Sequence, residues 1–75
     1  MTMARIELNA DTTGVVWKIL KQAGDSVEAD EPVMILESMK MEIPVAHESG
    51  GRVLEILVKE GDHVVEGQVV GSLES

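Results

Sequence analysis

One lysine stands between two methionines near the middle of the chain, in the run ESMKME that covers residues 37–42. A lysine amine is a nucleophile in its neutral form, so an exposed lysine is a point at which a group can be attached covalently. Alternation along an extended chain places Met39 and Met41 on one face and Lys40 on the other. We therefore expect Lys40 to point outward while the two methionines pack beneath it.

The lysine lies at the junction of two similar halves of the chain. Residues 14–38 align without a gap with residues 51–75, at an offset of 37 residues, and eleven of these twenty-five pairs are identical. Solenoid repeats need about three copies to bury a continuous core. Two copies instead predict two interlocked halves related by a pseudo-twofold axis, with residues 39–42 as the link between them.

Short apolar segments separated by turn residues predict an all-β fold. Val, Ile and Leu dominate the apolar set, and the Gly-Asp dipeptides at positions 24–25 and 61–62 favour tight turns. Pro32 and Pro44 exclude long helices around them and fit best at strand edges or starts. The spacing therefore indicates about eight short strands in a small sandwich or flattened barrel.

The expected link between the halves has the wrong residues for an ordinary turn. A two-residue hairpin loop needs positive φ at both central positions and is usually Asn-Gly, whereas here it is Met39-Lys40. Natural sequences break such local rules mainly at functional sites. The turn thus marks Lys40 as the candidate site for chemistry, independently of any motif.

Composition argues against several classes of function. The 75 residues allow one domain, residues 1–75, and the net charge of −8 argues against nucleic-acid binding, which needs a basic face. There is no cysteine, no apolar stretch long enough to cross a membrane and no signal-peptide pattern, so we expect a cytoplasmic, monomeric domain. His47 and His63 lack partners at metal-ligand spacing, and Trp17, aligned with Leu54, is expected to pack in the fold.

The run ESMKME closely resembles the biotin attachment motif of biotin carboxyl carrier proteins, in which a small residue precedes Met-Lys-Met. The resemblance covers essentially the whole chain, including both Gly-Asp turns and the distance from Lys40 to the last residue. Ser38 stands where alanine is common in the family, and no protruding thumb segment is inserted near residues 23–27. The resemblance implies a barrel-sandwich hybrid of two four-stranded antiparallel sheets, of the thumbless, small single-domain type.

A member of this family acts as a substrate and shuttle and is not catalytic alone. The resemblance implies biotin attached covalently to Lys40 by a biotin protein ligase, with Met39 and Met41 as the flanks of the motif. It also implies that biotin carries a carboxyl group between the biotin carboxylase and the carboxyltransferase of a biotin-dependent carboxylase. The residues that we expect to contribute to recognition by the ligase belong to the same run: Glu37, Ser38 and Glu42.

Two other classes of function fit parts of the pattern. A lipoyl carrier, either a domain of a 2-oxoacid dehydrogenase-type complex or a dual biotin/lipoyl attachment protein, has the same fold and also uses a hairpin lysine. Lipoyl domains typically place Asp before the lysine and a small residue after it, so the two methionines favour biotin. An adaptor that binds partners through its acidic surface would not require Met-Lys-Met at the centre of the repeat.

Overall fold

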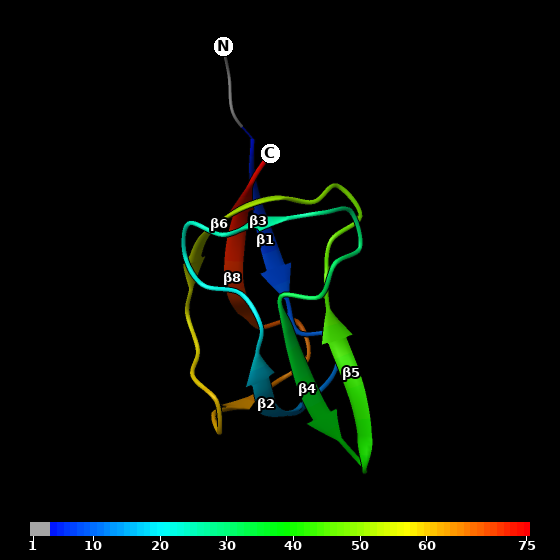
Figure 1. The fold of residues 1–75 in the computed structure, drawn as a ribbon. Coiled ribbons are helices and arrows are strands. Elements are labelled where there is room, and N and C mark those ends of the chain that lie inside the picture. Colours follow the sequence, from blue (N-terminus) through cyan, green and yellow to red (C-terminus); the bar gives the residue numbers. More distant parts are fainter. Residues whose placement is uncertain (1–3) are drawn as a thin grey trace.

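The structure is a computed structural model and describes residues 4–75. Its regular elements over this range are eight strands: β1 (Arg5–Asn9), β2 (Gly14–Ile19), β3 (Ser26–Val27), β4 (Met34–Ser38), β5 (Met41–Val45), β6 (Gly51–Ile56), β7 (His63–Val64) and β8 (Val69–Glu74). All strand pairs are antiparallel, and they form two four-stranded sheets, as expected from the sequence. We call the sheet with strand order β1-β8-β6-β3 sheet A and the sheet with order β5-β4-β2-β7 sheet B (Figure 1).

The strand pairing shows the predicted pseudo-twofold relation. The offset of 37 residues carries β2 onto β6 and β4 onto β8, and each sheet takes two strands from each half. The hydrogen bonds between the halves repeat in the same way. Gly24 N–H donates to Val53 O over 2.8 Å, and Gly61 N–H donates to Val16 O over 2.7 Å. The two halves are therefore interlocked.

The core is made of aliphatic side chains from both sheets. Many of them are equivalent in the two halves, such as Leu36 and Leu73, which are both 0% exposed. Burial of apolar surface is the main favourable term in folding, and here it stabilises a small domain that has no disulfide. The members of the core are Leu8, Ala10, Val16, Val27, Val33, Met34, Leu36, Val45, Val53, Val58, Val64, Val70 and Leu73.

Trp17 is not part of this core, so the expectation that it packs in the fold is wrong. Its side chain is 43% exposed. The cause is a β-bulge, because the register of β2 against β4 shifts between Val16 and Lys18 and leaves Trp17 as the extra residue. Val16 keeps its place in the core, while Trp17 lies beside Lys18, whose Nζ is 5.9 Å from the centre of the indole ring.

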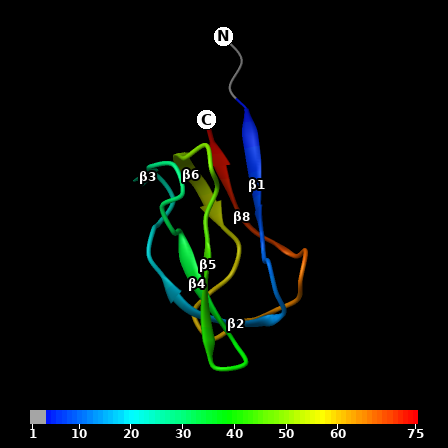
Figure 2. The ribbon, with the colours of Figure 1, turned by 90° about the vertical axis from the view of Figure 1, so that its right-hand side faces the viewer.

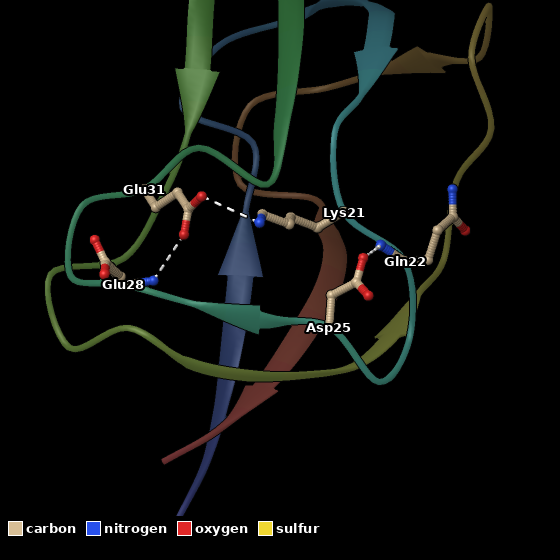
Figure 3. Close-up of polar contacts among 5 residues, drawn as sticks. All are labelled: Lys21, Gln22, Asp25, Glu28 and Glu31. Atoms are coloured by element: carbon tan, nitrogen blue, oxygen red, sulfur yellow. Dashed lines mark hydrogen bonds and ion pairs between the residues drawn. The ribbon is translucent and has the colours of Figure 1, made fainter.

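Polar side chains cap backbone N–H groups in the links on either side of β3 (Figure 3). Asp25 Oδ2 accepts a hydrogen bond of 2.8 Å from Gln22 N–H. Glu31 Oε1 accepts one of 2.8 Å from Glu28 N–H, and Glu31 Oε2 lies 3.1 Å from Lys21 Nζ. The Glu28 N–H and the Lys21 ammonium lower the pKa of Glu31 below its usual value, because both favour the charged carboxylate.

The second half has the equivalent capping hydrogen bonds, but one of the acceptor side chains is of a different type. Asp62 Oδ2 accepts a hydrogen bond of 2.9 Å from Lys59 N–H, as its equivalent does in the first half. Gln68 Oε1 accepts one of 3.0 Å from Val65 N–H, in the place that corresponds to Glu31. The acceptor of this hydrogen bond is thus a carboxylate in the first half and a neutral amide in the second.

The β4–β5 hairpin and the two ends of the described chain lie at opposite ends of the molecule (Figures 1 and 2). Ser75 N–H donates to Ala4 O over 3.0 Å, so these two residues are neighbours. The links 20–25 and 57–62 have equal length, so the first contains no inserted segment relative to the second. Within residues 4–75, no helix is long and apolar enough to cross a membrane.

Candidate functional site

Lys40 occupies the tip of the β4–β5 hairpin. Ser38 pairs directly with Met41, which leaves Met39 and Lys40 as a two-residue turn. Their φ angles are 51° and 65°, as a turn that matches the twist of a hairpin requires. For a residue other than glycine, the left-handed region costs about 1–2 kcal/mol. The predicted conflict between sequence and turn geometry is therefore present in the structure.

The methionines do not pack beneath the lysine, so that expectation is wrong. Met39 is 92% exposed and Met41 is 62% exposed, and Lys40 is exposed as well. The alternation rule holds for an extended chain, whereas the backbone at the turn is left-handed. The hairpin also continues beyond the core, whose last buried member on β4 is Leu36. All three side chains of the motif are thus presented to solvent.

Two glutamates face each other one step below the tip. Glu37 and Glu42 are directly opposite in the β4–β5 pairing, and both are exposed. Like charges in this arrangement destabilise a hairpin, by roughly 0.2–1 kcal/mol. Neither of the two ion pairs found between residues 4 and 75 involves these carboxylates or Lys40. The structure therefore brings all six residues singled out in the sequence into one acidic, protruding tip.

Gly14 supports the base of the hairpin, a role that the motif gave no reason to expect. A Cβ at this position would lie 2.4 Å from the Glu37 carbonyl oxygen and 3.3 Å from Ser38 Cβ. The absence of a side chain therefore lets the start of β2 approach the end of β4. Gly51 makes the same close approach, because its Cβ would lie 2.5 Å from Glu74 O. The only signal in the sequence is that these two glycines are equivalent in the repeat.

The described part of the chain offers no second site of this kind. Residues 4–75 contain no pocket and no cluster of three or more His, Cys, Asp or Glu side chains that could hold a metal ion. His47 Nδ1 lies 2.9 Å from Ser49 Oγ in a turn, and His63 is exposed on β7. What the structure does place at the tip is one exposed amine, that of Lys40, at the turn of a hairpin.

Comparison with known proteins agrees with a cofactor-carrying domain. Residues 4–73 match the family model described as "Biotin-requiring enzyme". The biotin/lipoyl attachment protein of Bacillus subtilis (strain 168) is 48% identical over 62 residues, which are 83% of this chain and 85% of that protein. The biotin carboxyl carrier protein of acetyl-CoA carboxylase from Pyropia yezoensis is 41% identical over 58 residues, or 77% of this chain and 37% of that protein.

A solved structure supports the same assignment. The lipoyl domain of the 2-oxoglutarate dehydrogenase complex from Azotobacter vinelandii superposes with a TM-score of 0.75 at 31% identity, covering 91% of this chain and 94% of that one. The fold and the protruding lysine hairpin thus define a carrier domain that is not catalytic alone. The chain belongs to the biotin/lipoyl attachment family, whose members hold biotin or lipoate through a covalent bond.

Proposed function

We propose that this domain is a biotin carboxyl carrier, with biotin joined by an amide bond to Nζ of Lys40. The observation that carries the proposal is the two-residue, left-handed turn that holds Lys40 exposed at the tip, with an exposed methionine on either side. The tip fits an acylated lysine, because no residue between 4 and 75 forms an ion pair with this amine and nothing encloses it.

The residues of the chain act by positioning. The paired strands β4 and β5 place the turn that contains Lys40 at the far end of the molecule from the chain ends (Figure 1), and the lysine is exposed there. Attached biotin supplies the capacity to carry a carboxyl group. A tethered group samples an active site at an effective concentration in the mM range, so a rigid domain with a mobile side chain suits a shuttle.

We propose three protein partners, namely a biotin protein ligase, a biotin carboxylase and a carboxyltransferase. The net charge of −8 favours partners with basic surfaces, and Glu37 and Glu42 place two of the acidic residues beside the amine. No hydrogen bond to Lys40 Nζ exists within the part of the chain that the structure describes. The attaching enzyme must therefore supply the base that deprotonates the amine.

Lipoate is the second candidate, and the similarity to a lipoyl domain at a TM-score of 0.75 favours it specifically. The exposed Met39 and Met41 argue for biotin, since the resemblance associates lipoyl lysines with Asp and a small residue as neighbours. Incubation of the purified domain with a biotin protein ligase or a lipoate ligase, followed by intact-mass measurement, distinguishes the two. We expect one biotinyl group and no lipoyl group.

Two variants control this experiment. Lys40→Ala should remove the adduct, while Lys59→Ala, which changes an exposed lysine at the edge of a turn, should keep it. A lipoyl adduct alone would assign the domain to lipoate carriers. An adduct that survives in Lys40→Ala would move the attachment site elsewhere.

A further inference from the structure

The pseudo-twofold repeat provides an internal comparison between the outer faces of the two sheets. Sheets A and B share one backbone arrangement, including a β-bulge at the equivalent place in β2 and β6. Residues that differ in chemistry between the two outer faces are therefore not required by the fold. Such differences are the place to search for interactions with other proteins.

The outer face of sheet A is polar, and an ion pair crosses it. Glu7, Ser72 and Glu55 form a row across β1, β8 and β6. Nη2 of Arg5 on β1 lies 2.7 Å from Oε1 of Glu55 on β6, and this ion pair passes across β8. Ser72, on the strand between them, is only 1% exposed. Two of the charges on this face, those of Arg5 and Glu55, are thus already paired with each other.

The outer face of sheet B is apolar at most of the equivalent positions. Trp17 is 43% exposed at the bulge, Pro44 is exposed on the edge strand, and Ile35 between them is half-buried. Lys18 corresponds to Glu55 of sheet A, but it lies against the indole ring and forms no ion pair across the sheet. Two rows of directly opposed residues make up this face: Lys18, Ile35 and Pro44, and then Val15, Glu37 and Glu42 toward the hairpin tip.

Six replacements account for the difference between the faces. From sheet A to sheet B they are Leu54 to Trp17, Ser72 to Ile35, Glu7 to Pro44, Arg52 to Val15, Glu55 to Lys18 and Arg5 to Glu42. Three of the six exchange a polar or charged residue for an apolar one, two reverse a charge, and one introduces the only tryptophan of the chain. Exposed apolar patches mark interaction surfaces, and tryptophan is enriched among the residues that dominate binding energy.

We propose that the outer face of sheet B is the docking surface for the ligase that attaches biotin to Lys40. This proposal rests on the attachment of biotin at that residue. The chain has four lysines, so the amine alone does not identify the target, and the ligase must recognise the surface around it. The face continues into the hairpin through the row that contains Glu37 and Glu42.

The charged and apolar side chains on the outer face of sheet B define what the complementary surface of the ligase must offer. An apolar centre over Trp17 and Pro44 meets apolar side chains of the ligase. The two exposed carboxylates at the hairpin end meet basic side chains at the margin nearest its active site, and this fixes the orientation of the domain. Docking in this way places Lys40 at the active site and keeps the other three lysines out of it.

The proposal is tested by measuring the kinetics with which purified ligase transfers biotin to variants of the domain. In these variants, residues of sheet B are replaced by those at the equivalent positions of sheet A. Trp17→Leu and Pro44→Glu install the residues found at the equivalent positions 54 and 7, so both are compatible with the backbone. We expect KM for the domain to rise by about tenfold with kcat unchanged, as for loss of a dominant interface residue. Leu54→Ala on sheet A is the matched control and should leave KM unchanged. Thermal unfolding of each variant shows that it is folded.

A direct binding measurement accompanies the kinetics. Incorporation of 5-fluorotryptophan labels Trp17 alone, because the chain has one tryptophan. In the Lys40→Ala protein, which cannot be modified, its 19F resonance should shift or broaden when unlabelled ligase is added. A resonance that instead moves with the concentration of the domain itself would place a second copy of the chain on this face and overturn the proposal.

The remaining outcomes distinguish a failure of the docking proposal from a failure of the proposed carrier function. An unmodified wild-type domain refutes the carrier function at Lys40. A wild-type domain that accepts biotin, with Trp17→Leu and Pro44→Glu at unchanged KM, leaves the carrier function intact and refutes docking through sheet B. An equal rise of KM in Leu54→Ala also refutes it, because that variant lies on the opposite face.

Discussion

Replacing the two turn residues of the lysine hairpin should stabilise the domain. Met39 and Lys40 have φ angles of 51° and 65°, and each left-handed residue other than glycine costs about 1–2 kcal/mol. Lys40→Gly removes that cost but adds about 0.5–1 kcal/mol of chain entropy in the unfolded state. Asn tolerates positive φ better than Met, so Met39→Asn gains a similar net amount. The double variant should therefore gain about 1–2 kcal/mol in its free energy of unfolding.

Thermal and urea unfolding followed by circular dichroism measure this gain. For a domain of this size, each kcal/mol corresponds to a rise in Tm of about 4–8 °C. Asp30→Gly is a positive control, because Asp30 has a φ of 63° and its equivalent in the second half is already Gly67. Glu7→Gly, at an exposed and extended position of β1, is the opposite control and should lose about 0.5–1 kcal/mol.

An unchanged or lower Tm in the double variant, together with a gain in Asp30→Gly, would refute the reasoning. It would mean that the turn around Lys40 is not strained in solution. The single variant Met39→Asn keeps the lysine, so its biotin loading can be measured on a stabilised hairpin. A gain in stability with slower loading would show that the exposed methionine side chain matters to the ligase rather than to the fold.

Three further predictions concern the base of the hairpin and the caps. Gly14→Ala should lower the free energy of unfolding by about 1–3 kcal/mol, measured in urea, because its Cβ would meet the Glu37 carbonyl oxygen. Glu42→Lys should raise Tm, since it replaces a like-charge pair by an opposite one worth about 0.2–1 kcal/mol, and should slow biotin loading. Glu31→Gln should reduce the loss of stability at acid pH while keeping the cap that Gln68 makes in the other half.

The direction of the acid effect follows from the lowered pKa of Glu31. The carboxylate contributes stability above the usual value of 4.5, where it is charged in both folded and unfolded chains. That contribution is lost as the pH falls below 4.5 and through the lower pKa of the folded state. Urea titrations from pH 7 to pH 3 should show a steeper loss in the wild type than in Glu31→Gln. Parallel curves would contradict this prediction. An unchanged stability of Gly14→Ala would contradict the prediction for Gly14, and a lower Tm of Glu42→Lys would contradict the prediction for Glu42.

The repeat made most of the fold predictable from the sequence. Two like halves joined at residues 39–42 imply paired strands with a turn at the junction, and the poor fit of Met39-Lys40 to that turn predicted the positive φ values. Pro44 lies on the edge strand β5, a position that the sequence favoured for proline. These features depend on local chemistry and on the offset between the halves, both of which can be read along the chain.

The features that were missed depend on contacts between distant segments. The exposure of Trp17 follows from a bulge, which is a property of the register between β2 and β4 and has no signature in residue type. The exposure of Met39 and Met41 follows from how far the hairpin extends beyond the core. Gly14 is needed only because β4 ends against it, which is visible once both strands are placed.

The contact between Ser75 and Ala4 has a consequence for engineering. These residues occupy the places, related by the pseudo-twofold axis, that Ser38 and Met41 hold beside the lysine. A Met-Lys dipeptide inserted between Ser75 and Ala4, with new ends opened in the link 57–62, would yield a circular permutant with a reactive amine at each pole. Such a molecule could receive two biotin groups pointing in opposite directions, and could thereby bridge two biotin-binding surfaces through one rigid body.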